Sequence, residues 1–161
     1  MKNLNKIAFI TLLVTSFISC NNDDATPVNE EEVITTITTT LTGGGQTITL
    51  KSRDLDGDGP NAPIVTVSGN LVAGTTYTGS TTFLNELESP AEDITVEVEE
   101  EGADHQVFYQ LPSSIGTVTY TDTDANGRPI GLNFTLVAGT SGSTGTLTVT
   151  MRHLPHKTAS V

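Results

Sequence analysis

From Val33 onward, apolar and polar residues alternate along most of the chain. The alternation is clearest at residues 46–50, 64–67, 94–98 and 145–151, where Thr or Glu separates Ile, Leu or Val. A period of two residues is typical of a β-strand with one face in the core and the other in water. Clusters of Gly, Asn, Ser and Pro separate these segments. The pattern predicts seven to nine short strands, and no segment shows a sustained helical period.

Short strands separated by turns predict an all-β domain over residues 33–161, an immunoglobulin/fibronectin III-like sandwich of two sheets. A chain of this length buries enough surface to fold without disulfides. Residues 71–77 resemble the Leu-x-Pro-Gly-Thr-x-Tyr stretch of fibronectin type III domains, with Ala73 in place of proline. The resemblance implies that Leu71 and Tyr77 enter the core, and that the Tyr77 hydroxyl bonds to nearby backbone.

Residues 1–19 have the three parts of a secretory signal peptide: a basic start, an apolar run and a small residue at the cleavage point. The apolar run covers residues 7–18, which is shorter than the ~20 residues of a membrane-spanning helix. Residues 17–20, Phe-Ile-Ser-Cys, resemble the lipobox of bacterial lipoproteins, with Phe where Leu is usual. We therefore expect lipid attachment to Cys20, the only cysteine. The alternative is an ordinary secretory peptide followed by an unused cysteine.

Residues 20–32 are rich in Asn, Asp and Glu and contain little to bury, which predicts a disordered tether between the lipid and the domain. Asp23 and Asp24 resemble the surface-export signal of lipoproteins in some bacteria with two membranes. That signal would place the domain on the cell exterior, whereas a plain acidic linker would leave it on the periplasmic face. In both cases we expect a protein of the outer membrane that contacts the bilayer only through its lipid anchor.

Charge and composition exclude several kinds of function. Without Lys2 and Lys6, five basic and nineteen acidic residues remain, a net charge of −14. Such a surface repels phosphates, so nucleic acid is not an expected partner. The chain has no Trp and few other aromatic residues for a sugar-stacking platform or a haem pocket. It also lacks a Gly-x-Ser-x-Gly nucleophile turn, so we do not expect an enzyme.

Two acidic loops are candidate calcium sites. Asp54, Asp56 and Asp58 precede Gly59 with the spacing of a calcium-binding loop, and carboxylates two residues apart can converge on one cation. An EF-hand is excluded because Val65 stands where the bidentate glutamate is required. A looser calcium site remains open, beside the alternative of a hairpin loop in which Asp and Gly merely suit the turn. The second and weaker candidate has the same pattern at Asp122, Asp124 and Asn126.

His105 and His153 are candidate ligands for zinc or copper, because both lie at the ends of predicted strands. Together with Asp104 or Glu101, two imidazoles would make a suitable ligand set. The sequence does not show that the two strands adjoin. The alternative is a structural or merely exposed role for both histidines.

Several segments together resemble a group of small bacterial envelope lipoproteins of unknown function. The resemblance spans nearly all of the chain after Cys20, at residues 30–36, 53–59, 84–87, 92–95, 104–109, 126–132 and 152–157. Such proteins often carry the automatic label "type 1 periplasmic binding fold superfamily", which implies a two-domain α/β architecture far larger than the 142 residues after residue 19. Similar chains continue into a further strand after residues 152–157. Without that strand, we expect an open sheet edge that could pair with a partner.

The sequence favours a non-enzymatic module, anchored through Cys20, that binds a ligand or a partner such as an outer-membrane receptor or another envelope protein. The alternative function is binding of a divalent cation, calcium above all, at Asp54, Asp56 and Asp58. No cofactor is required by either hypothesis, and calcium is the one ion that the second hypothesis needs.

Overall fold

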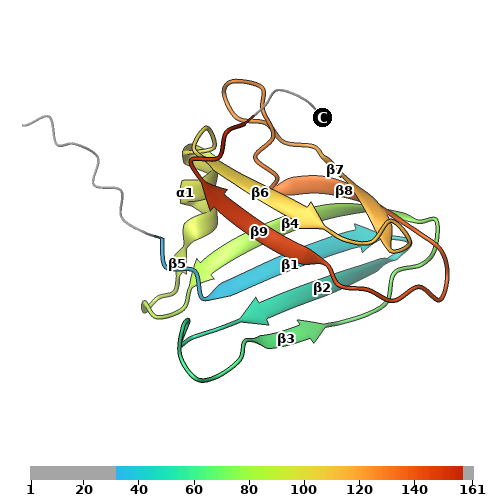
Figure 1. Ribbon diagram of the computed structural model, residues 1–161, viewed down its shortest axis with the longest axis horizontal. Helices are drawn as coiled ribbons and strands as arrows, with labels where there is room; N and C mark the ends of the chain where they lie inside the picture. The colour runs from blue at the N-terminus through green and yellow to red at the C-terminus, as the bar shows by residue number, and fades with distance from the viewer. Residues whose placement is uncertain (1–31, 158–161) are drawn as a thin grey trace, which may run out of the picture. The chain divides into compact units, whose positions relative to one another are not determined.

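The structure is a computed structural model that describes residues 32–157. Its main element is a sheet of seven antiparallel strands with the order β3-β2-β1-β4-β8-β7, in which the short β5 pairs with the end of β4 (Figure 1). These strands are β1 (Thr36–Gly43), β2 (Gln46–Arg53), β3 (Ile64–Val67), β4 (Thr76–Asn85), β5 (Glu92–Asp93), β7 (Gly116–Tyr120) and β8 (Asn133–Ala138).

A second sheet of two strands lies over the first. It consists of β6 (His105–Gln110) and β9 (Thr148–His153), and in Figure 1 these strands cross in front of the large sheet. The prediction of a two-sheet all-β sandwich with seven to nine strands is confirmed, with nine strands in the described residues. The division is uneven, because one layer holds seven strands and the other two.

The alternation of residue types decides which side of each strand is buried. In β4, Tyr77, Thr81 and Phe83 are almost inaccessible to solvent, whereas Thr78 and Thr82 between them are exposed. Antiparallel pairing places opposite residues on the same face, so Thr42, Thr78 and Thr135 form one row across β1, β4 and β8 on the outer face. The large sheet therefore has an apolar inner face and an outer face of threonines.

Two clusters of buried side chains fill the space between the layers. The first is centred on Tyr77 and Phe134 near the β1–β2 hairpin. The second joins Phe83 of the large sheet to Val107 of β6, with Ile94 and Val98 alongside. Each cluster draws side chains from strands far apart in the sequence, so neither layer can form its buried face alone.

The tyrosine-corner stretch has the geometry that its sequence implies. Tyr77 is fully buried, and Leu71 packs against the same cluster. The Tyr77 hydroxyl accepts hydrogen bonds from the Val72 N–H at 2.9 Å and from Gln46 Nε2 at 3.0 Å. This one side chain therefore holds the connection before β4 against the start of β2.

The expectation of a strand at residues 94–98 was wrong, because the segment forms helix α1 (Ile94–Glu100). The Asp93 carboxylate caps the helix by accepting the Thr95 N–H at 3.0 Å. In a strand, Val96 would share a face with Ile94 and Val98, but in the structure it is 52% exposed while those two are buried. Burial of residues four apart is the helical period, so packing on β4 decided between two patterns that the sequence allows.

One residue that was assigned to the tether contacts the folded domain. Glu32 was assigned to the tether, but its carboxylate contacts the buried His105. The expected signal peptide at residues 1–19, the lipidation site Cys20 and the rest of the tether lie outside the described residues. The expected further strand after residues 152–157 also lies outside the described residues, within which β9 pairs only with β6.

Candidate functional site

Strand pairing brings His105 and His153 together. They are direct partners in the register of β6 and β9, and their rings stack with centroids 4.8 Å apart and an angle of 16° between the planes. The strands that carry the two predicted ligands therefore do adjoin. Nitrogen lone pairs lie in the plane of an imidazole ring, so stacked rings hold them in separate, nearly parallel planes. The stacking does not aim the two histidines at one ion.

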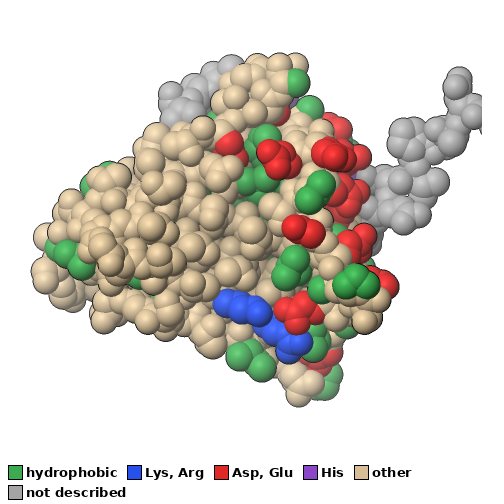
Figure 2. Space-filling view, turned by 180° about the vertical axis from the view of Figure 1, so that it is seen from behind, with side chains coloured by type: hydrophobic (Ala, Val, Ile, Leu, Met, Phe, Trp, Pro, Cys, Tyr) green, Lys and Arg blue, Asp and Glu red, His purple; other side chains and the backbone are tan. Residues whose placement is uncertain are grey.

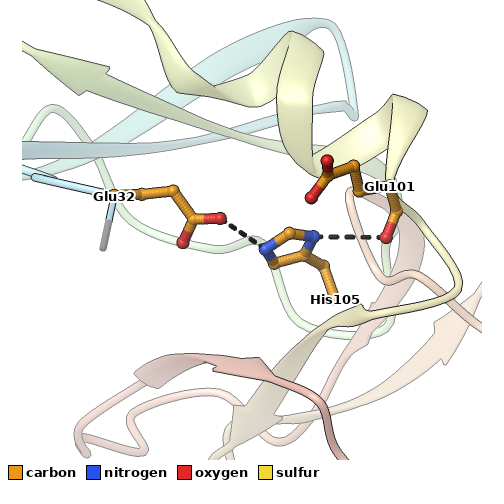
Figure 3. Close-up of side chains that lie close together, drawn as sticks. All are labelled: Glu32, Glu101 and His105. Carbon is orange, nitrogen blue, oxygen red and sulfur yellow. Dashed lines mark hydrogen bonds and ion pairs between the residues drawn. The ribbon is translucent and has the colours of Figure 1, made fainter. Parts of the chain in front are cut away.

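His105 is fully buried and both of its ring nitrogens have partners (Figure 3). Nδ1 lies 3.2 Å from the backbone oxygen of Glu101. Nε2 lies 2.6 Å from Oε1 of Glu32. A carbonyl oxygen only accepts hydrogen bonds, so Nδ1 is the nitrogen that carries a proton toward Glu101. The Nε2 edge of the ring therefore faces the carboxylate.

The Glu101 carboxylate completes a group of three. Figure 3 shows Glu32 entering from the segment before β1 and Glu101 from the end of α1, both directed toward His105. One ligand atom from each of the three lies within 4.8 Å of the others, and residues 32–157 contain no other such group of His, Cys, Asp or Glu. The sequence had named His105 and Glu101 together. Sequence reasoning missed Glu32 because the acidic segment that contains it has the composition of a tether.

The group lies in an acidic surrounding. Partial burial and the neighbouring carboxylates of Glu32 and Glu101 raise the pKa of Glu97, on the adjoining helix α1, above its usual range. Glu92 adds to the same effect, while His105 opposes it. Negative charge is therefore crowded at this end of α1.

The first acidic loop forms turns without gathering its carboxylates. Oδ1 of Asp54 accepts the N–H groups of Asp56 and Gly57 at 3.3 and 3.0 Å. Oδ2 of Asp56 accepts the backbone N–H of Asn61 at 3.2 Å and its side-chain amide at 2.7 Å. These bonds, the amide first, lower the pKa of Asp56. Asp58 does not join them in a three-carboxylate group, so calcium binding here stays a prediction.

The second acidic loop uses its carboxylates to hold backbone. Asp122 accepts the N–H groups of Gly131 and Asn133, each at 2.8 Å. Oδ1 of Asp124 accepts the N–H groups of Asn126 and Arg128, at 2.8 and 2.9 Å. Asn126 is exposed and contributes only this backbone group. The weaker calcium candidate is thus occupied by internal hydrogen bonds.

The other carboxylate oxygen of Asp124 pairs with a buried lysine. Lys157 Nζ lies 3.1 Å from Asp124 Oδ2 and also donates to the Gly102 carbonyl, and both charged side chains are almost wholly buried. Burial alone would raise the pKa of Asp124, but the donors from Arg128, Lys157 and Asn126 hold it below the usual range. The ion pair fastens Lys157 to the loop between β7 and β8, and its hydrogen bond to Gly102 fastens it to the turn after α1.

An apolar cleft of about 560 Å³ opens over the inner face of the large sheet near the β1–β2 hairpin, beside loop residues that include Leu111, Ile115 and Leu147. Its floor consists of inward side chains of the large sheet, and its rim is the Gly-, Ser- and Thr-rich loop at residues 139–145. Not one of the side chains that line it is charged; the apolar ones include Leu41, Ile48, Leu50, Val67, Leu71, Leu111, Ile115, Leu136 and Leu147.

Charge is unevenly distributed over the surface. Viewed from behind, acidic side chains gather on one side of the molecule, while most of the remaining face is uncharged (Figure 2). The threonine rows of the outer sheet face account for this neutrality. The basic side chains of β2, Lys51 and Arg53, both pair with Glu86, at 3.6 and 2.7 Å. The charges and the apolar cleft thus occupy different parts of the molecule.

Comparisons with protein families, with curated proteins and with solved structures found no match. Within the described residues, no helix is both long and apolar enough to cross a membrane. The function must therefore be argued from the chain's own geometry.

Proposed function

We propose that the chain is a lipid-anchored, non-enzymatic binding module of the bacterial outer membrane that takes an uncharged, largely apolar molecule into the cleft. The observation that supports the proposal is the lack of any charged side chain in the cleft lining of a strongly acidic protein. A volume of this size and an apolar lining with a few polar groups at the rim are typical of small-molecule sites.

The surrounding charge restricts the ligand. An anion would be repelled by the net charge of the domain, and a cation would find stronger partners among the glutamates near α1 than in the cleft. Burying either ion against aliphatic side chains would carry a large desolvation cost. A neutral apolar ligand avoids both problems, because its gain comes from surface removed from water.

The position of the cleft suits a tethered module. Glu32, where the described chain begins, precedes the first strand, and Leu41 in the cleft floor lies near the far end of that strand. At about 3.3 Å per residue, the five steps along β1 from Thr36 to Leu41 span roughly 17 Å. The cleft therefore opens far from the point where the N-terminal segment joins the domain.

Filling the cleft should abolish binding. Gly69 lines the cleft, and a Cβ added there would meet only Ile48 Cγ1, at 3.6 Å. We expect G69F to weaken binding of the neutral fluorescent probe N-phenyl-1-naphthylamine by about tenfold or more, equivalent to about 1.4 kcal/mol. Thr119→Phe adds the same ring on the outer face of β7 and should leave binding unchanged. Equal probe binding by wild type and G69F would contradict the proposed ligand site.

The anchor has its own test. Cys20→Ser removes the sulfur that would carry the lipid. We expect the wild-type protein to sediment with outer membranes and to show acyl chains on its N-terminal peptide by mass spectrometry. The variant should lose the acyl mass and leave the membrane fraction, because several acyl chains are what make such an attachment stable. An unacylated wild-type N-terminus would refute the lipoprotein assignment.

A further inference from the structure

The contact between His105 and Glu32 brings acceptors together in a way that requires a cation. The Glu101 carbonyl fixes the N–H of a neutral His105 on Nδ1. Nε2 then presents its lone pair to Glu32 Oε1 at 2.6 Å. A Glu101 carboxylate oxygen lies within 4.8 Å of a ring nitrogen of His105 and of a Glu32 carboxylate oxygen. Two acceptors this close need a positive charge between them, which is either a proton or a metal ion.

We propose that Glu32, Glu101 and His105 form a binding site for one divalent transition-metal ion, with zinc as the reference ion. Imidazole nitrogen and carboxylate oxygen are ligands that zinc accepts, at about 2.0–2.2 Å in four-coordinate geometry. Three protein ligands leave the fourth position for water. The ion would replace only the contact between His105 Nε2 and Glu32 Oε1, and the hydrogen bond from His105 Nδ1 to the Glu101 carbonyl would stay.

The orientation of His105 matches that of a metal ligand. Metal-bound histidines donate their other ring N–H to a carboxylate or a backbone carbonyl, which fixes the ring and directs the free nitrogen at the ion. In this structure the Glu101 carbonyl has that role, and burial of the ring between α1 and β9 removes its alternatives. Because Glu101 supplies both the orienting carbonyl and a carboxylate, the ring and one oxygen ligand move as a unit.

Charge and access also favour an ion at this position. Glu97 lies one helical turn before Glu101, whose N–H donates to its carbonyl, so a further carboxylate adds repulsion to that between Glu32 and Glu101. A divalent cation relieves this repulsion more than the single proton that it displaces. Glu101 is exposed and Glu32 is partly exposed, so two of the three ligand residues reach solvent. Binding transfers one proton from the Nε2–Oε1 contact to the buffer and forms bonds from the ion to both atoms.

The consequence is a link between two distant parts of the chain. Glu32 lies in the segment before β1, and the ion would link it to the turn between α1 and β6. This inference does not rest on the proposed apolar ligand, because the cleft and the ion site share no residue.

Zinc titration of the full-length protein by isothermal calorimetry tests the site. We expect one zinc ion per chain, with about one proton released when the heat is compared between buffers. E32Q and E101Q should each weaken binding by about tenfold or more, as expected for loss of a zinc ligand. E100Q removes the same charge from the end of the same helix, on an exposed residue outside the group, and should bind as the wild type does.

Two further measurements separate this site from its alternatives. H156Q, which changes the exposed His156 outside the group, should keep wild-type affinity, and loss of binding in this variant would overturn the assignment in favour of a surface histidine. Cobalt substituted for zinc should give the intense visible bands of a four-coordinate ion in the wild type. This readout needs no variant, so it stands if E32Q fails to fold. A weak six-coordinate spectrum, or no stoichiometric zinc binding, refutes the proposal.

Discussion

Lys157→Ala is expected to destabilise the domain by about 3–5 kcal/mol, measured as the free energy of unfolding in urea. Lys157 and Asp124 are both nearly inaccessible to solvent, and removing the lysine leaves a buried carboxylate without its counter-charge. The Gly102 carbonyl loses its donor at the same time. Because small domains are stable by only about 5–15 kcal/mol, the loss would be a large part of the total.

Lys51→Ala is the matched control, since it also removes a lysine from an ion pair. Lys51 lies 3.6 Å from Glu86 and its side chain is 39% exposed. Exposed pairs contribute about 0–1 kcal/mol, so this variant should unfold close to the wild type. Similar losses in the two variants would show that burial of the Lys157 pair does not determine its contribution.

The pH dependence follows from the same pair. The pKa of Asp124 is lower in the folded state than its usual value of about 3.9, so the folded state binds its proton more weakly than the unfolded state does. The stabilisation from the carboxylate is therefore present above about pH 4 and is lost as the pH falls through the folded-state pKa. The difference in stability between wild type and Lys157→Ala should narrow over that acidic range. A constant difference down to pH 2 would argue against the ion pair as its source.

The strands were predictable because local chemistry and packing agree there. Threonine alternating with aliphatic residues gives one dry and one wet face, and β3 has the bounds that its sequence predicted. The Tyr77 corner was predictable from seven consecutive residues. In α1, by contrast, the residues 94–98 satisfy both a strand period and a helical spacing of four. Asp93 as a cap and the glutamates that follow it were the available helical signals.

The candidate metal site was only partly predictable because it depends on contacts between distant residues. His105 and Glu101 lie four residues apart, and their proximity could be expected from the sequence. Glu32 is 73 residues away from His105, and nothing in its acidic neighbourhood distinguishes it from a tether residue. The pairing of Asp124 with Lys157 could not be predicted either, because these residues are also far apart in the sequence. The composition of a segment predicts whether the segment as a whole is ordered. It does not reveal that one of its residues contacts a buried side chain far away in the sequence.

Phe134→Ala is the second variant with a large expected effect, a loss of about 3–5 kcal/mol of unfolding free energy. Phe134 is fully buried in β8, and its ring centroid lies 4.2 Å from that of Tyr109 in the opposite layer. The ring also covers Gly79 of β4, where an added Cβ would overlap the ring atoms. Glycine in a strand interior therefore marks a place where a side chain from the next strand crosses the backbone.

Phe108→Ala serves as the control for loss of an aromatic ring from the small sheet. Phe108 is only partly buried, and its ring faces the Arg152 guanidinium at 5.2 Å, a contact that contributes about 0.5–1 kcal/mol at exposed sites. Its removal should cost much less than removal of Phe134.

G79A should also destabilise the domain, by about 1–3 kcal/mol through overpacking. G79A combined with Phe134→Leu should recover part of that loss, because the smaller side chain makes room for the methyl group. If G79A is neutral, then the Phe134 ring does not press on β4. A loss for Phe134→Ala no larger than that for Phe108→Ala would contradict the contribution expected from its burial.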